Sequence, residues 1–455
     1  MINEYLDVLI IGAGLSGVGA ACHLTKNCPT KSFAILEGRE RMGGTWDLFQ
    51  YPGIRSDSDM YTLGYNFKPW TNPKAIADGP SILSYIKETA QENNIDKHIR
   101  YQQKVKSANW SNKEALWTVT IEDASTGKEK IISCNFFLSC AGYYSYESGY
   151  QPEFEAKSDF EGDIIHPQSW PKNFDYSGKK IVVIGSGATA VTIVPAMTDK
   201  AKHVTMLQRS PTYMMSLPAK DESINKLRKY LPDNLVYRIA RTRNVALSLG
   251  TYQISRRFPE KTKDFLLAQV EKQLGPNGDM KHFTPNYNPW DERLCAVTNG
   301  DLFKAIKNNK ASVVTDHIKK FTKEGVLLKS GKLLEADVII TATGLNVQML
   351  GGIKLSVDNK KFNITEKMLY KGVLIEDLPN LGLVFGYTNA SWTLKADLVS
   401  EYVCRLINKM DRENMRQCTP RNINKKVHHS PFLDMRSGYI QRALDKVPQQ
   451  GSHLP

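Results

Sequence analysis

Two glycine-rich turns, each placed directly after a short apolar run, constrain the fold more than any other feature of the chain. The first run, residues 7–11, leads into the turn GAGLSG at 12–17, and helical spacing follows. The second, residues 180–184, leads into GSGATA at 185–190 and again into a helical pattern. Strand, glycine turn and helix in this order begin a dinucleotide-binding unit. The sequence therefore predicts an α/β fold with two Rossmann-like domains.

The residues that end the second strand of each unit differ in charge. Glu37 follows the first turn, and Arg209 follows the second, each at the spacing of about 20 residues at which this fold contacts a ribose. A carboxylate there needs a free 2′-hydroxyl, which favours FAD or NAD over NADP, whereas a guanidinium suits a 2′-phosphate. We therefore expect FAD in the first unit and NADPH in the second. The alternative is that Arg209 is only a solvated residue at a strand end.

The order of the patterns predicts that one domain is inserted in the other. Residues 1–148 form the first part of the FAD-binding domain, and residues 149–332 the NADP-binding domain with a helical insertion at about 220–275. Residues 333–455 form the second part of the FAD-binding domain and a C-terminal tail. Within the first part, alternation between residues 99 and 141 predicts an antiparallel meander. The strand ending at Gly344 is interpreted as carrying the chain back to the first domain.

The net charge and the length of the apolar runs indicate which kinds of ligand or surface the protein can bind. The net charge of +13 favours anionic ligands, and no charge-free apolar run reaches the roughly 18 residues that a membrane span needs. No signal peptide is visible at the first residues, and we expect a cytoplasmic protein. We expect no nucleic-acid partner. The basic stretch at 220–275 has two interpretations, weak peripheral contact with the inner face of a membrane or a solvated helix face.

The seven cysteines include no Cys-x-x-Cys pair. This spacing argues against a disulfide framework and against a zinc site, and we expect no metal. Residues 38–60 hold no redox cysteine pair, which excludes a disulfide reductase of the two-dinucleotide class. His428 and His429 stand apart from other candidate ligands and are predicted to be surface residues.

The stretch between the two units has the pattern Phe-x-Gly-x-x-x-His-x-x-x-Trp-Pro at residues 160–171. Together with the glycine turns, this pattern resembles the fingerprint of the type I Baeyer–Villiger monooxygenases, which are flavoenzymes. The resemblance spans nearly the whole chain and is strongest to mycobacterial members. It is carried by residues 43–57, 181–190, 203–213 and 386–398.

The resemblance implies contacts for both cofactors. Those implied for FAD are Gly12, Gly14, Ser16, Gly17, Glu37, Thr45, Trp46, Asp47, Leu48, Asp57 and the backbone at Val105. Those implied for NADP are Gly185, Ser186, Gly187, Ala188, Thr189, Ala190, Gln208, Arg209 and Ser210, with Arg55, Ser56 and Asp57 near the nicotinamide.

The resemblance also implies the chemistry. NADPH reduces the flavin, O₂ gives a C4a-peroxyflavin, and a small hydrophobic ketone is converted to an ester; sulfides and thioamide-type compounds are further expected substrates. Arg293 is implied to stabilise the anionic species and Asp57 to hold its guanidinium. His166 is assigned a hinge or hydrogen-bonding role rather than general-base catalysis. Two departures are Glu292, where some members carry a basic residue, and a chain that ends earlier than relatives, so that part of a substrate-covering tail is expected to be missing.

Two other functions stay open at this point. One is an S- or N-oxygenating flavin monooxygenase, against which Trp170 and Pro171 favour ketone oxidation. The other, from a different class, is a nucleotide-binding sensor without turnover, which O₂-dependent NADPH consumption would exclude. The sequence leaves the natural substrate and the oligomeric state undetermined.

Overall fold

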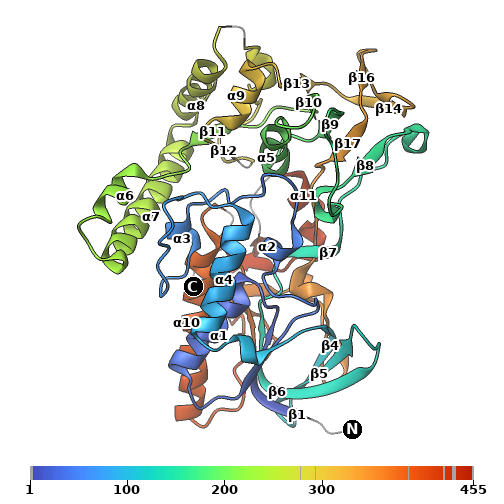
Figure 1. The fold of residues 1–455 in the computed structure, drawn as a ribbon. Helices are drawn as coiled ribbons and strands as arrows, with labels where there is room; N and C mark the ends of the chain where they lie inside the picture. The colour runs from blue at the N-terminus through green and yellow to red at the C-terminus, as the bar shows by residue number, and fades with distance from the viewer. Residues whose placement is uncertain are drawn as a thin grey trace.

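The computed structural model describes residues 4–276, 278–292, 294–387, 389–423, 426–432 and 437–452. Two sheets, one above the other, dominate it, with α2, β7 and α11 between them (Figure 1). Their bounds are Thr45–Leu48, Tyr144–Gly149 and Gly438–Gln441. This arrangement confirms the predicted α/β fold class.

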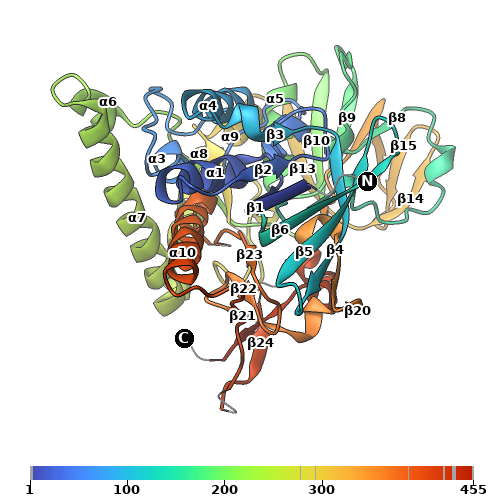
Figure 2. The same cartoon turned by 90° about the horizontal axis from the view of Figure 1, so that it is seen from below.

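The first sheet has a parallel centre in the order β3-β2-β1-β6-β23. Side chains alternate across its middle strand: Val8 and Ile10 face the helices, and Leu9 and Ile11 face the meander. Helices α1 and α10 pack together on the first of these faces (Figure 2). The elements are β1 (Glu4–Ile11), α1 (Leu15–Asn27), β2 (Phe33–Leu36), β3 (Ile99–Arg100), β6 (Glu129–Ser139), β23 (Leu381–Leu383) and α10 (Trp392–Arg412).

The second sheet is fully parallel and has the order β13-β10-β9-β17-β8. Its middle strand is buried on both faces, with Val183 on one side and Val182 on the other. The elements are β8 (Asp163–Ile165), β9 (Lys180–Ile184), α5 (Ala188–Met197), β10 (His203–Gln208), α9 (Asp301–Lys307), β13 (Ala311–Thr315) and β17 (Val338–Thr341). The two sheets therefore share one strand order. The strand before the glycine turn, β1 or β9, has the next two strands of its unit on one side and the crossing strand, β6 or β17, on the other.

An antiparallel meander, as predicted, extends the first sheet from β6. It consists of β4 (Gln103–Ser111), β5 (Leu116–Asp123) and β6. Trp110 and Trp117 are fully buried on its inner face with ring centroids 5.6 Å apart. The meander thus supplies the second core of the first domain.

Two short antiparallel strands, β7 and β18 (Leu345–Val347), connect the domains. His166 lies against this connector: its Nε2 is 3.1 Å from the Gly344 carbonyl oxygen, and a Cβ at Gly149 would overlap its ring. The Gln168 backbone N–H donates to Nδ1 at 3.2 Å, so the ring is a hydrogen-bonding element, as predicted. Gly162 of the same fingerprint stands so close to the Asp337 carbonyl that a side chain would overlap it.

One expectation needs correction. The strand ending before Gly344, β17, pairs with β9 and β8 and so completes the second sheet instead of returning to the first. The return is made by β18, which follows it. We therefore propose that the first domain resumes after Gly344 and not at residue 333.

Helices α6 (Glu222–Leu227), α7 (Asp233–Arg257) and α8 (Pro259–Leu274) form the helical insertion. The long helix α7 leaves the second domain and packs on α3 (Met60–Leu63) of the first (Figure 1). Among the described residues, no helix has the length and apolar character to cross a membrane. The seven cysteines all lie in the described part of the chain, and none of them is joined to another in a disulfide.

The remaining elements complete the two domains. The helices are α4 (Gly79–Glu92) and the short α2, α3 and α11 given above. The strands are β11 (Met214–Leu217), β12 (Cys295–Thr298), β14 (Ile318–Thr322), β15 (Gly325–Leu328), β16 (Leu333–Glu335), β19 (Lys354–Val357), β20 (Lys360–Lys361), β21 (Met368–Tyr370), β22 (Leu374–Ile375), β24 (His429–Pro431) and β25 (Gln449–Gly451).

Candidate active site

The first glycine turn is shaped by close backbone contacts. Gly12 has φ +98°, and a Cβ there would lie 2.8 Å from the Cys140 carbonyl oxygen at the end of β6. A side chain at Gly17 would overlap the Gly12 carbonyl. Gly14 caps α1 and lies against the backbone of Gly44, since a Cβ on it would be 3.4 Å from the Gly44 Cα. Gly12 and Gly17 have no room for a side chain, and the close approach of backbone in this turn leaves the N–H groups at the start of α1 available for an anion.

The Glu37 carboxylate stabilises this turn by accepting hydrogen bonds from the backbone. Its Oε2 accepts from the Ala13 N–H at 2.8 Å and its Oε1 from the Arg39 N–H at 3.0 Å. Burial raises the pKa of the carboxyl, and these two N–H groups oppose the rise. The Gln103 N–H donates to the Glu37 carbonyl at 2.9 Å, which brings β4, and with it the buried Val105, to the same edge of the sheet.

The loop after β2 folds over the turn. The Gly43 N–H donates to the Ala13 carbonyl at 2.9 Å, and Thr45, Trp46, Asp47 and Leu48 form the single turn of α2 directly behind it. Asp47 is buried and held by the Arg39 Nη2 at 2.8 Å and the Arg41 Nε at 3.1 Å. Leu48 packs against the core of the second domain. We call each glycine turn, with the charged residue after the following strand, a cradle: Glu37 belongs to the first and Arg209 to the second. This loop therefore reaches from the first cradle to the second domain.

An aromatic group beside the first turn was not predicted. The Trp392 Nε1 donates to the Ser16 Oγ at 2.7 Å, and the Trp392 ring stacks on Tyr143 with centroids 5.4 Å apart. Phe385 lies 5.3 Å from Trp392 and 5.1 Å from Tyr143. No local motif signals this group, because Tyr143 comes from one part of the chain and Phe385 and Trp392 from another.

The loop at residues 51–57 joins the two domains. Arg55 forms a two-fold ion pair with Asp301 of α9, and Ser56 is buried with its N–H bonded to the Ala77 carbonyl at 3.0 Å. Tyr51 is buried within hydrogen-bonding reach of Thr189 in the second glycine turn, and burial raises the pKa of its phenol. Asp57 lies exposed on the same loop.

The second turn repeats the first with one difference. Gly185 has φ +137°, and a Cβ there would overlap the Ala342 carbonyl at the end of β17. Each crossing strand, β6 or β17, therefore ends against a glycine turn, with the carbonyl of Cys140 or Ala342 in contact with it. This explains why small residues precede both Gly142 and Gly344. Gly187, in contrast, faces open space, since a Cβ added to it would have no neighbouring atom within 4 Å. Ala188 starts α5, and Ala190 is fully buried where a third glycine stands in the first turn.

At the end of β10 the three predicted residues behave differently. Gln208 is 1% exposed, and its amide donates inward to the His282 carbonyl at 2.7 Å and to the Thr315 Oγ1 at 2.9 Å. Arg209 and Ser210 are exposed, and the Ser186 Oγ donates to the Ser210 carbonyl at 3.2 Å. Arg209 is thus the side chain at this edge that is free to face a ligand.

Glu292 stands near Arg209. Burial raises the pKa of the Glu292 carboxyl, and the positive charge of Arg209 opposes the rise. The next residue, Arg293, the predicted catalytic cation, lies outside the described part of the chain. No group of three or more metal-ligating side chains occurs among the residues that the structure describes.

The fold and the site together define an α/β protein with two Rossmann-like units, in which Glu37 lies at the first glycine turn and the exposed Arg209 follows the second. The profile of the flavin-binding monooxygenase-like family matches residues 71–429, and an NAD(P)-binding Rossmann-like domain matches residues 10–71. The chain belongs to the flavin-binding monooxygenase-like family and is an enzyme of that kind.

Known proteins agree with this assignment. FAD-containing monooxygenase EthA of Mycolicibacterium smegmatis is 54% identical, over 100% of this chain and 92% of EthA. OTEMO in complex with FAD and NADP has a similar fold, with TM-score 0.77 and 22% identity over 92% of this chain and 87% of OTEMO. Cyclohexanone monooxygenase bound to ε-caprolactone gives TM-score 0.76 and 19% identity, over 92% and 90%. The predicted resemblance is confirmed.

Proposed function

We propose that this enzyme uses FAD, NADPH and O₂ to convert small hydrophobic ketones to esters. In balance, a ketone, O₂, NADPH and a proton give an ester, water and NADP⁺. The observation that carries the proposal is the pair of cradles with opposite charge, Glu37 at the first and Arg209 at the second. A ketone substrate is favoured by the likeness in fold to cyclohexanone monooxygenase, whose bound ε-caprolactone is a cyclic ester.

The residues present fit both cofactors. At the first cradle, the steric need for glycine and the acceptor Glu37 suit a dinucleotide with a free ribose hydroxyl, and the close relative EthA is FAD-containing. At the second, the open space over Gly187 and the exposed Arg209 suit a 2′-phosphorylated dinucleotide. FAD, when bound, supplies hydride acceptance and O₂ activation.

The protein's own part is to position and shield the reactants. Arg293 would stabilise negative charge that develops on the substrate carbonyl oxygen, and Asp57 would hold the guanidinium of Arg293 in place. The stacked rings of Tyr143, Trp392 and Phe385 give an apolar wall beside the first cradle, which favours a hydrophobic substrate and excludes water. An Arg293→Ala variant with full ester formation and normal NADPH use would remove that residue from the mechanism.

Oxidation of sulfides and thioamide-type compounds is part of the same proposal, since one oxygen donor serves both. The competing functions are an oxygenase restricted to sulfur and nitrogen, and a sensor without turnover. The experiment is to measure released flavin and NADPH oxidation over a panel of ketones and sulfides, with product identification. Esters formed at the expense of NADPH support the proposal. Protein without flavin after reconstitution, or a strong preference for NADH, overturns it.

Peripheral membrane contact is a separate and weaker proposal. The helical insertion exposes large apolar side chains next to basic residues such as Arg238, Arg257 and Lys261. The apolar ones are Leu235, Ile239, Leu247, Leu249, Ile254, Phe258 and Phe265. Flotation with anionic vesicles, but not with neutral ones, is the expected result. Flotation with neither rejects it.

A further inference from the structure

Helix α7 is fixed to the first domain by its N-terminal half. The Tyr237 hydroxyl donates to the Tyr65 carbonyl at 2.8 Å. The Arg241 Nη1 donates to the carbonyls of Tyr61 and Gly64, both at 2.8 Å. Tyr237 is 2% exposed, and these bonds satisfy the carbonyl groups that end α3. This half of the helix therefore moves with the first domain.

A buried polar group extends the same anchor into the core. The Arg241 Nη2 lies 3.5 Å from the Asp397 Oδ2 of α10, and the Asp397 Oδ1 lies 3.2 Å from the His23 Nε2 of α1. The Asn66 N–H also donates to the Asp397 Oδ2, at 2.9 Å. Asp397 and His23 are 3% and 6% exposed, so the pairing is protected from solvent.

The C-terminal end of α7 contacts a different element, the loop at residues 286–292. The Tyr252 and Trp290 rings meet edge to face with centroids 5.6 Å apart. The Arg256 Nη1 donates to the Asp291 Oδ1 at 2.9 Å, while the Asp291 Oδ2 accepts from the Asn288 N–H at 3.3 Å. One turn of helix thus holds both a ring and a carboxylate of the loop.

The loop has a conformation that needs such support. Trp290 has φ +72°, a left-handed conformation that a bulky residue rarely adopts unless its surroundings hold it there. From the other side, the Tyr213 hydroxyl donates to the Tyr287 carbonyl at 2.6 Å. The loop continues through Arg293 in the sequence to Cys295, whose Sγ lies 3.8 Å from the Ser186 carbonyl in the second glycine turn. A shift of the loop would therefore be transmitted through Cys295 to the second glycine turn.

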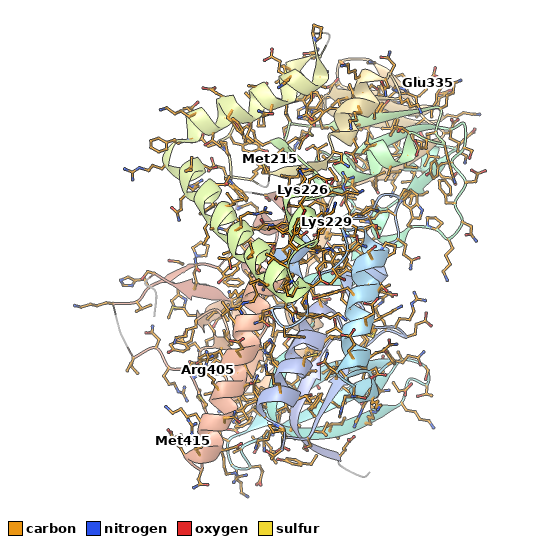
Figure 3. The ribbon with its side chains drawn as sticks, turned by 60° about the vertical axis from the view of Figure 1, so that its left-hand side comes forward. Met215, Lys226, Lys229, Glu335, Arg405 and Met415 are labelled. Atoms are coloured by element: carbon orange, nitrogen blue, oxygen red, sulfur yellow. The ribbon has the colours of Figure 1, made fainter. Side chains whose placement is uncertain are left out.

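We propose that α7 is a strut that sets the loop 286–292 relative to the first domain. Figure 3 shows α7 reaching from α8 at the top of the molecule to the upper end of α10. Trp290 and Asp291 are positioning residues, and Tyr252 and Arg256 are the groups through which the strut acts. The consequence for oxygenation rests on the proposed function.

The test uses the full chain and a matched pair of double variants. Tyr252→Ala/Arg256→Ala removes both strut contacts. Gln253→Ala/Arg257→Ala changes the neighbouring exposed positions and is the control. The two readouts are hydrogen exchange of peptides covering residues 284–292 and the ratio of oxygenated product to NADPH consumed. Arg256→Gln, with Arg256→Lys as the charge-retaining rescue, serves if the double variant fails to fold.

We expect exchange in the loop to rise about tenfold in the strut variant and to stay unchanged in the control. We expect the product-to-NADPH ratio to fall about threefold, with the remainder appearing as H₂O₂. Unchanged exchange overturns the strut whatever the activity. Faster exchange with an unchanged ratio overturns the positioning role. If the wild-type enzyme oxygenates no substrate, the proposed function is rejected. Hydrogen exchange of the loop then still tests whether α7 acts as a strut.

Discussion

Arg55 of the first domain and Asp301 of the second form a two-fold ion pair, with Nη1–Oδ2 at 2.5 Å and Nη2–Oδ1 at 3.3 Å. Arg55 is predicted to lie near the nicotinamide end of NADP. In the structure its guanidinium pairs with Asp301 at the first turn of α9, with 14% of the Arg55 side chain exposed. The pair fixes the two domains to each other next to the second glycine turn.

Removing this pair is expected to loosen the domain arrangement. Asp301→Asn should lower the free energy of unfolding by about 1–2 kcal/mol and raise the KM for NADPH about three- to tenfold. FAD content should not change, because no contact of the first cradle is lost. Asp279→Asn, at an exposed carboxylate paired with Lys281 in the same domain, is the control. An unchanged KM would show that the pair does not bear on the coenzyme.

The two glycines of the second turn should respond differently to the same change. In Gly185→Ala the new methyl group overlaps the Ala342 carbonyl at a positive φ, and we expect a loss of about 2–4 kcal/mol in stability. In Gly187→Ala the methyl group enters open space, so stability should stay within about 0.5 kcal/mol. Thermal unfolding measures both. NADPH binding should weaken in Gly187→Ala; equal destabilisation of the two variants would contradict the description of this turn.

Glu292 should reduce the preference for NADPH over NADH. Its carboxyl interacts with Arg209, and burial raises its pKa while Arg209 opposes the rise. Glu292→Gln removes a negative charge beside the guanidinium and should increase the NADPH preference in kcat/KM about three- to tenfold. Arg209→Ala should reduce the same preference by a larger factor. If Arg209→Ala leaves the preference unchanged, Arg209 is only a solvated residue.

His166 should make stability depend on pH. Burial lowers the pKa of its imidazole, opposed by the bond to the Gly344 carbonyl. The folded protein therefore favours the neutral ring, and the unfolded chain binds a proton more readily below the ordinary pKa of about 6.5. The free energy of unfolding should fall as pH drops below that value. In His166→Gln this fall should be smaller, measured by urea unfolding between pH 5 and 8 on the two proteins; equal slopes would contradict it.

The local parts of the site could be predicted from the sequence. Each glycine turn, its flanking strand and helix, and the residues Glu37 and Arg209 lie within one continuous unit, so their spacing carries the information. The Glu292 departure was visible from the resemblance to the family, some members of which carry a basic residue there. His166 was predicted to hydrogen-bond at the domain junction because it stands between the two units.

The parts of the site that depend on long-range contacts could not be predicted from the sequence. Arg55 pairs with Asp301, Ser16 with Trp392, and Tyr51 with Thr189, all between segments far apart in the chain. Gln208 has the right spacing for a ligand contact, yet its amide faces inward because Thr315 on the neighbouring strand bonds it. A single sequence does not say which of two faces a strand-end side chain takes.

The most direct test of the account is the fate of molecular oxygen. The purified enzyme, loaded with FAD, is incubated with NADPH, a small hydrophobic ketone and ¹⁸O₂, and the product is analysed by mass spectrometry. We predict an ester carrying one ¹⁸O atom for each NADPH consumed. NADPH consumed with all the label in H₂O₂, or an ester without label, would contradict it.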